Sequence, residues 1–439
     1  MRPPSRLRWL LLILIGFSLF GWAVTGSTVY LRLVYAFVLL LGGGYLWAVL
    51  ALRGIRIRRT SRLQRLSVGD LFEEQFEIIN TSRQPCLWLE VENASPLPNA
   101  EGSRLLTAIS GRERRSYVAR TWLIRRGAFS LGPTRLASGD PFGLFVSRKE
   151  IAADDSLIVL PMSVAIQTFP PPPGILPGGR AIRRKTMDVT PHASGVREYV
   201  PGDPMKRIHW PSTVRRGRFM VKEFEQDPQS DLWLFLDAHA AAHIRQPAQE
   251  DLTFKVDQWL QKRPQVRLPC DTFEYAVSAA ASLAQHFLRQ QRAVGLACAA
   301  GRLTVVPAER GDRQLGKIMD VLAFLEPLGA LPLLGLVQLQ ARLLPLGSSV
   351  ILITSAARPD LLLAVEDLQR RSLHPFVLLI APETFGGEQS QTLADGLLNR
   401  NVPLARVTYG GDLASQLAVP ALYFERPWRP HPTDFVYPS

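Results

Sequence analysis

The sequence of 439 residues contains few cysteines, and they form no recognisable pattern. Cys86, Cys270 and Cys298 are far apart, and no Cys-x-x-Cys pair occurs. This excludes the disulfide framework of small secreted domains, and it also excludes a cysteine-rich zinc ribbon. We therefore expect the soluble part of the chain to lie in a reducing compartment.

The sequence also lacks a phosphate-binding loop and a concentrated nucleic-acid surface. No segment fits Gly-x-x-x-x-Gly-Lys-Ser/Thr, since the glycines at 42–44 lie inside an apolar run. Acidic residues are in deficit, with 38 against 51 basic ones and a formal net charge of +13. The basic side chains are scattered without interleaved aromatics, so we predict no nucleic-acid partner. An anionic membrane surface or an acidic protein partner is compatible with this charge.

Long apolar runs are present only near the N-terminus. Residues 10–24 are uncharged and apolar, and residues 29–52 are apolar with Arg32 as the only charge. A membrane-spanning helix needs about 20 apolar residues, which the second run provides and the first nearly provides. With the short connection at 26–28, this predicts a transmembrane helical hairpin over residues 1–55.

Basic residues flank both apolar runs and predict the orientation of the hairpin. They are Arg2, Arg6, Arg8, Arg53, Arg56, Arg58, Arg59 and Arg62. The positive-inside rule then predicts a two-pass protein of the cell inner (plasma) membrane, with both termini and the soluble domains in the cytoplasm. In the alternative, the first run is a cleaved signal peptide and the second run is a stop-transfer helix.

Two further segments precede the C-terminal half of the chain. Residues 56–168 show short runs of period two separated by turn signals, for example at 74–79 and 115–122, which predicts a small β-sandwich-like domain. We interpret its Gly- and Pro-rich segments 125–133 and 138–145 as tight turns, with a docking face as the alternative. Residues 169–194 are rich in Pro and Gly with a basic continuation, and we predict a linker there.

From residue 231 strands and helices alternate. Residues 231–237 form a continuous apolar run that ends in Asp237, as in a strand buried on both faces of a parallel sheet. We predict later strands at 293–299, 303–306, 349–353, 376–380 and 404–408, and helices at 272–292, 312–325, 359–371 and 389–399. This alternation implies a doubly wound α/β sheet with right-handed crossovers. We also predict an irregular insertion at 238–270, with a short helix at 254–261, and an extended Pro/aromatic tail at 411–439.

The segment 195–225 concentrates turn formers, charges and aromatics, and we name it the core motif. Its candidate docking residues are Arg197, Tyr199, Gly202, Asp203, Arg207, His209, Trp210 and Arg215. Asp203 can cap a helical turn and pair with Arg207, and Trp210 can pack under the sheet with Ile208. We interpret the motif as a structural clasp whose exposed arginines dock an acidic partner. Catalysis by Asp203, Arg207 and His209 is the alternative.

The core motif, Arg125-Arg-Gly127, the segment 139–145 and the strand to Asp237 together resemble the bacterial and archaeal family catalogued as domain of unknown function 58. The resemblance spans most of the chain, including the two apolar runs. It implies a von Willebrand factor A-like domain over residues 195–410. It also implies frequent partnership with MoxR-type AAA+ ATPases and with transglutaminase-like membrane proteins. It implies no established chemistry.

A factor A domain usually carries a metal-ion-dependent adhesion site, and here that site is degenerate. The motif Asp-x-Ser-x-Ser is replaced by Asp237-Ala-His-Ala-Ala241, and Ser355, after Thr354, stands where a carboxylate is expected. With Asp237, His239, Thr354 and Ser355 as its remnants, we predict no bound cofactor, with Mg²⁺ as the alternative. The spacing of His239 and His243 gives a weaker zinc alternative.

These features together predict a non-enzymatic, membrane-anchored scaffold. It would dock a MoxR-type AAA+ ATPase and assist the assembly or maturation of envelope or secreted proteins. The alternatives are an enzyme that uses Asp203, Arg207 and His209, and a metal-dependent adhesion module.

Overall fold

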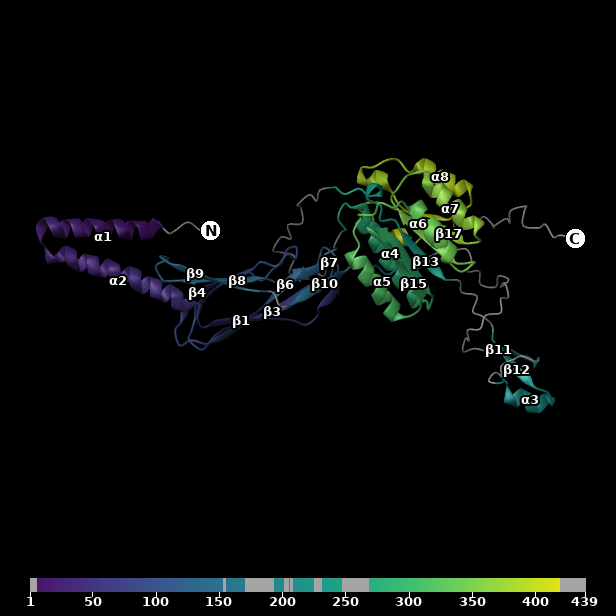
Figure 1. The fold of residues 1–439 in the computed structure, drawn as a ribbon, viewed down its shortest axis with the longest axis horizontal. Coiled ribbons are helices and arrows are strands. Elements are labelled where there is room, and N and C mark those ends of the chain that lie inside the picture. The colour runs from purple at the N-terminus through teal and green to yellow at the C-terminus, as the bar shows by residue number, and fades with distance from the viewer. Residues whose placement is uncertain are drawn as a thin grey trace. The chain divides into compact units, whose positions relative to one another are not determined.

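The computed structural model describes residues 6–152, 155–169, 193–200, 205, 208–224, 231–246 and 268–418 (Figure 1). The chain forms two compact units, one built mainly from residues up to Ser163 and the other mainly from residues after it.

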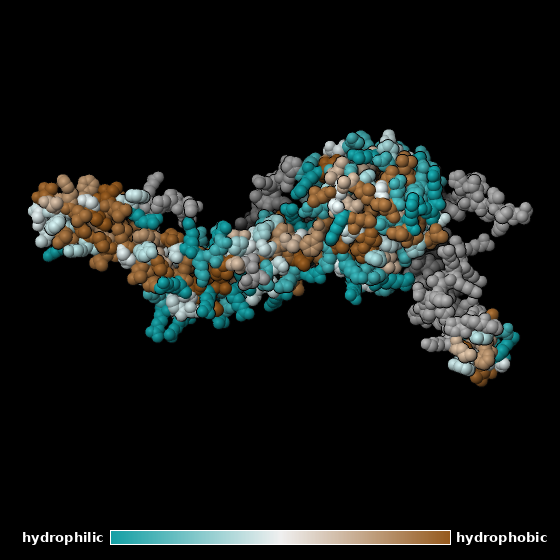
Figure 2. Space-filling view, viewed as in Figure 1, coloured by the Kyte–Doolittle hydropathy of each residue, from teal (hydrophilic) through white to brown (hydrophobic). Residues whose placement is uncertain are grey.

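Two helices open the first unit, α1 (Arg6–Thr25) and α2 (Thr28–Ala51). Large apolar side chains such as Phe17 and Leu39 are exposed all around them, and hydrophobic surface covers both helices in Figure 2. A helix that is apolar on every side belongs in a protein core or in a bilayer. Residues 7–25 and 28–51 are each long and apolar enough to cross a membrane, as the sequence predicts.

The rest of the first unit is built of short strands in three sheets. The first sheet contains β1 (Ile55–Ser61), β3 (Leu71–Asn80) and β6 (Arg114–Trp122), and the second contains β5 (Arg104–Ile109), β4 (Cys86–Asn93), β8 (Thr134–Gly139) and β9 (Val146–Ile151). The third contains β2 (Arg65–Ser67), β10 (Ser156–Leu160) and β7 (Gly127–Ser130). Alternate residues of β3 and β4, such as Phe76, Ile78 and Leu89, share one buried core. The period-two pattern therefore identified real half-buried strands.

Residues 164–168, at the end of the range predicted for the sandwich domain, lie in the second unit. The backbone N–H of Val164 donates to Oγ of Ser282 at 3.0 Å. The ring of Phe169 packs on Phe287 and Phe376, with centroids 5.5 and 5.0 Å apart. Residues 164–169 thus belong to the second unit, where Ile166 and Phe169 are buried. Most of the predicted linker, residues 170–192, lies outside the described residues.

A six-stranded sheet forms the centre of the second unit, with the order β15-β14-β13-β16-β17-β18. Its strands are β13 (Leu232–Leu236), β14 (Val294–Ala300), β15 (Arg302–Glu309), β16 (Ser349–Thr354), β17 (His374–Ile380) and β18 (Leu404–Val407). Neighbouring strands are parallel except for the pair β14 and β15. Every residue of β13 is buried, as the continuous apolar run predicts.

Helices cover both faces of this sheet (Figure 1). On one face, α6 (Leu333–Gln340), α7 (Asp360–Arg370) and α8 (Gln391–Asn399) pack with Trp233 and Phe235. On the other face, α4 (Thr272–Arg289) lies against β13, β14, β16 and β17. The predicted alternation of strands and helices is therefore present, and α5 (Asp312–Phe324) also lies where a helix is predicted.

Three details of the second unit differ from the predictions. Strand β15 is antiparallel to β14, because the single residue Gly301 joins them and a parallel pair needs a long crossover. Helix α6 has no predicted counterpart. Helix α9 (Leu413–Leu417) lies in the predicted extended tail, where Leu417 is fully buried. The predicted helix at 254–261 and the tail from residue 419 lie outside the described residues.

Candidate functional site

The core motif forms a small hairpin with its own helix. Strand β11 (Ala193–Glu198) pairs antiparallel with β12 (Met220–Phe224), and the backbone of Arg197 lies opposite Val221. These strands form a separate two-stranded sheet and add no strand to the six-stranded sheet. Among the described side chains of this hairpin, the apolar residues Ile208, Met220 and Val221 are buried.

Helix α3 (Trp210–Arg216) lies between the two strands, and His209 caps its start. The backbone N–H of Ser212 donates to Nδ1 of His209 at 3.3 Å, and Oγ of Ser212 lies 2.8 Å from the same nitrogen. Gly217 ends the helix with φ of 67°, a left-handed conformation that glycine adopts without strain. His209 therefore has a structural role as a cap, which fits the clasp interpretation.

Helix α3 and the turn that follows it expose both apolar and basic side chains. Trp210 is 61% exposed, Val214 is 80% exposed, and Phe219 is also exposed. Arg215 and Arg216 lie in the last turn of α3 and are exposed. The prediction that Trp210 packs under the sheet with Ile208 is wrong for Trp210, because Trp210 is exposed and only Ile208 is buried.

The other predicted residues of the core motif are only partly described. The ring of Tyr199 lies 6.1 Å from that of Phe219, and its backbone N–H donates to the Phe219 carbonyl at 2.9 Å. Gly202, Asp203 and Arg207 lie outside the described residues. Of the alternative catalytic set, His209 is the member that lies within the described residues.

A second candidate site lies at the carboxyl ends of β13 and β16. In an open α/β sheet ligands bind where the strand order reverses, and here the order reverses between these two strands. Asp237 follows β13 and is buried; its Oδ1 accepts the backbone N–H of His239 at 3.0 Å. Its Oδ2 accepts the hydroxyl of Thr354, at the end of β16, at 2.7 Å. The remnants of the predicted adhesion site are thus brought together.

His243, which the sequence suggests only as a zinc ligand, completes this cluster. Its Nε2 donates to the Asp237 carbonyl at 2.9 Å, while Nδ1 lies 3.1 Å from Oγ of Ser355 and 3.2 Å from Oγ1 of Thr272. Burial lowers the pKa of His243, against the opposing effect of Asp237. The imidazole is therefore neutral at pH 7 and bonded at both nitrogens. His239 and His243 flank a 3₁₀ turn, η2 (Ala240–Ala242), which does not provide the helix that the zinc hypothesis requires.

The residues of this cluster do not fit a magnesium ion. Both carboxylate oxygens of Asp237 already accept hydrogen bonds, and the hydroxyl of Ser355 donates to the Ala242 carbonyl at 2.6 Å. A hollow of about 20 Å³ beside Asp237 is lined also by Arg358 and Asp360. That volume is close to the minimum for one water molecule, and an arginine in its wall disfavours a cation.

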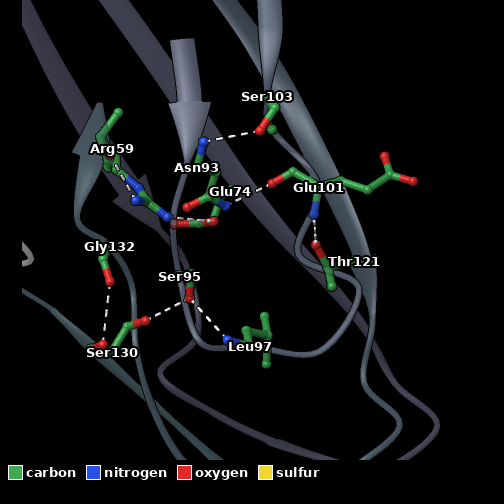
Figure 3. A network of polar contacts seen from close by, with 12 residues as sticks. Arg59, Glu74, Asn93, Ser95, Leu97, Glu101, Ser103, Thr121, Ser130 and Gly132 are labelled. Carbon is green, nitrogen blue, oxygen red and sulfur yellow. Dashed lines mark hydrogen bonds and ion pairs between the residues drawn. The ribbon is translucent and has the colours of Figure 1, made fainter. Parts of the chain in front are cut away.

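A third polar cluster lies in the sandwich (Figure 3). Arg59 donates from Nη2 to Oε1 of Glu74 at 2.8 Å and from Nη1 to Oγ1 of Thr134 at 2.9 Å. Its guanidinium carbon lies 4.7 Å from the centre of the Phe76 ring. By its position in the sequence Arg59 is a basic flank of the apolar runs, but its side chain is largely buried in an ion pair. Burial, the largest effect, raises the pKa of Glu74, while Arg59 opposes that rise.

Comparison with known proteins places the core motif in a family. Residues 195–256 match the family described as protein of unknown function DUF58. The uncharacterized protein YeaD of Bacillus subtilis (strain 168) is 24% identical over 325 residues, which cover 72% of this chain and 73% of that protein. Both matches agree with the resemblance found in the motif residues.

Solved structures offer weaker similarity. The CARDB domain of the PF1109 protein from Pyrococcus furiosus, in complex with di-metal ions, is 9% identical; the match covers 24% of this chain and 91% of that chain, with a TM-score of 0.18. The cupredoxin domain of amoB from Nitrosocaldus yellowstonii is 11% identical; the match covers 24% of this chain and 87% of that chain, with a TM-score of 0.19. Scores this low carry no argument about fold or function.

Proposed function

The chain belongs to the DUF58 family, and from this premise we propose that it is a membrane-anchored, non-enzymatic scaffold. Its core motif docks a MoxR-type AAA+ ATPase, and the scaffold couples that ATPase to the assembly or maturation of envelope or secreted proteins. A transglutaminase-like membrane protein is a further candidate partner.

The exposed side of the core motif is the observation that carries this proposal. Trp210, Val214, Arg215 and Arg216 on the short, capped helix α3 are exposed, as is Phe219 just after it. Aromatic residues and arginines are enriched in protein interfaces, and tryptophan and arginine dominate binding energy there. Such a surface fits a partner with an apolar pocket bordered by carboxylates.

The two N-terminal helices support the anchor. Both are apolar on all sides and long enough to span a bilayer. We place the soluble units in the cytoplasm, because basic residues such as Arg8 and Arg53 flank the two apolar runs of the sequence. An AAA+ ATPase then shares the compartment of the docking surface.

The topology of the second unit supports a factor A-like domain. In chain order its strands run 3-2-1-4-5-6 across the sheet, with the third strand antiparallel at one edge. Asp237 stands at the end of the first strand, where a factor A domain carries its metal site. Its oxygens are bonded to protein donors, so docking proceeds in this proposal without a metal.

A pull-down tests the docking function. The full chain and a MoxR-type ATPase are coexpressed, solubilised in mild detergent and captured through a tag on the full chain. We expect the wild type to retain the ATPase and the variants Trp210→Ala and Arg215→Glu/Arg216→Glu to lose most of it. Arg302→Glu, on edge strand β15, is the matched control and should retain it. Equal retention by all variants, or none by the wild type, would refute the docking surface.

A further inference from the structure

The loop that joins β8 to β9 in the sandwich is held in one conformation by Asp140. This carboxylate is buried, and its Oδ2 and Oδ1 accept the backbone N–H groups of Phe142 and Phe145 at 2.9 and 2.5 Å. Gly143 turns the chain with φ of 70°, and its N–H donates to the Asp140 carbonyl at 3.3 Å. Because the loop satisfies this charge internally, it can enter a poorly hydrated environment without leaving a bare carboxylate.

This loop packs on α2, within the stretch that is long enough to cross a membrane. A Cβ placed on Gly44 would lie 3.5 Å from the Phe145 ring and 3.6 Å from Leu144. The rings of Tyr45 and Phe145 meet edge to face with centroids 5.6 Å apart. Gly44 and Ala48, one turn apart, are the buried residues of α2. The sandwich therefore contacts the spanning helix itself as well as the chain that follows it.

The position of Gly44 along α2 sets the depth of the loop. Gly44 precedes the helix end at Ala51 by about 10 Å, at about 1.5 Å per residue. The whole helix is about 36 Å long, against about 30 Å for the hydrocarbon core of a bilayer. When α2 is centred in the bilayer, Gly44 lies inside the hydrocarbon core, several ångströms (~7 Å) from its boundary with the headgroups. Residues that touch Gly44 then reach the boundary between headgroups and acyl chains.

The outer side of the loop carries apolar side chains that the described protein does not cover. Phe142 is 58% exposed, and Val146, at the start of β9, is exposed as well. Arg148 and Lys149 follow on β9, and both are exposed. Aromatic rings that enter the interface, with basic residues behind them that attract anionic headgroups, are typical of surfaces that bind membranes.

We propose that the β8–β9 loop is a second membrane contact, with the Phe142 side chain inserted at the acyl–headgroup boundary of the bilayer that α2 crosses. The partner of this surface is the lipid itself. The inference rests on the proposed membrane anchor. It gives the loop a specific role: two contacts, the helix and the loop, fix the orientation of the sandwich on the membrane.

Spin labels on the full chain test this contact in vesicles of phosphatidylethanolamine and phosphatidylglycerol. Cys270 is replaced by serine, while Cys86 and Cys298 are buried and remain. A nitroxide is then attached to Phe142→Cys or, as a second site, to Val146→Cys. Leu39→Cys, on the 74% exposed Leu39 of α2, is the bilayer reference. Leu63→Cys, beyond the far end of β1 and 57% exposed, is the water reference.

The measurement compares relaxation of each label by oxygen, which partitions into lipid, with relaxation by a water-soluble nickel complex. We expect oxygen to dominate at Leu39 and Phe142 and the nickel complex to dominate at Leu63. A Phe142 label that behaves like Leu63, while Leu39 stays in lipid, would overturn the loop contact and leave the anchor intact. Water-like behaviour at Leu39 as well would overturn the anchor on which the inference rests.

Discussion

The hydroxyl of Thr354 donates a hydrogen bond of 2.7 Å to Oδ2 of Asp237 and joins the ends of two neighbouring parallel strands. Both side chains are buried, so neither group can exchange this partner for bulk water. In turn Oγ1 of Thr354 accepts the backbone N–H of Ala356 at 3.0 Å. The residues of the degenerate adhesion site therefore form a set of satisfied hydrogen bonds that links the carboxyl ends of β13 and β16.

Replacement of Thr354 by valine should destabilise the second unit by about 1–3 kcal/mol. The substitution preserves the shape of the side chain but leaves one buried oxygen of Asp237 without its donor. A buried acceptor that loses its partner costs more free energy than the loss of a solvent-exposed hydrogen bond. Urea unfolding of the full chain in detergent, followed by circular dichroism, measures the change. Thr304→Val, at a half-buried position on β15, is the control and should change stability by much less. Similar losses in both variants would contradict the role of the Asp237 contact.

The Arg59–Glu74 pair gives a prediction for the sandwich. The two side chains are 13% and 4% exposed, so Glu74→Gln leaves a buried guanidinium poorly compensated. We expect a loss of about 3–5 kcal/mol, and we expect Arg59→Met with Glu74→Leu to recover most of it.

The neighbouring residue provides a control for this experiment. Glu73 pairs with Arg120 at 2.8 Å, but these side chains are 48% and 51% exposed. Glu73→Gln should therefore cost less than about 1 kcal/mol in the same denaturant measurement. An equal loss from Glu73→Gln and Glu74→Gln would show that burial does not set the strength of these pairs.

Acidification should destabilise the second unit through its buried histidines. Burial, the largest effect in each case, lowers the pKa of His243, His286 and His374 below the ordinary 6.5. Between the lowered pKa and 6.5 the unfolded chain binds more protons than the folded chain, so stability rises with pH in that window. We expect the urea midpoint to be lower at pH 5.5 than at pH 7.5.

A single substitution tests the histidine origin of this effect. His374→Gln should reduce the difference in unfolding free energy between pH 7.5 and pH 5.5, because it removes one group that gains a proton on unfolding. Above pH 7.5 the variant and the wild type should show the same pH dependence. An unchanged difference would exclude His374 as a contributor.

Substitutions of His209, the cap of α3, distinguish a structural role of this residue from a catalytic one. His209→Ala removes the acceptor for the Ser212 N–H, at a cost of about 0.5–2 kcal/mol to the helix, whereas asparagine is a good cap and should restore it. Hydrogen exchange at the amides of Thr213 and Gly217, which bond within α3, measures the effect. Unchanged exchange in His209→Ala, together with the loss of an activity, would favour the catalytic alternative.

Several elements follow from local pattern alone, since their periodicity reports which side is buried. The period of two in β3 buries Phe72, Phe76 and Ile78 on one face. The three-to-four spacing of apolar residues from Thr272 produces α4. The apolar run before Asp237 produces the fully buried β13. Each prediction depends only on residues close in sequence, which is why it succeeds.

The sequence by itself determined the two apolar helices, the alternation of strands and helices, and the core motif that marks the DUF58 family. Only the tertiary structure decided which individual side chains are buried, which are exposed and which contact one another. Arg59 is buried against Glu74, Trp210 is exposed, and the loop at 140–145 lies on Gly44 of α2. The physical reason is distance along the chain. Asp237 and Thr354 are 117 residues apart, and their hydrogen bond exists because two parallel strands end side by side.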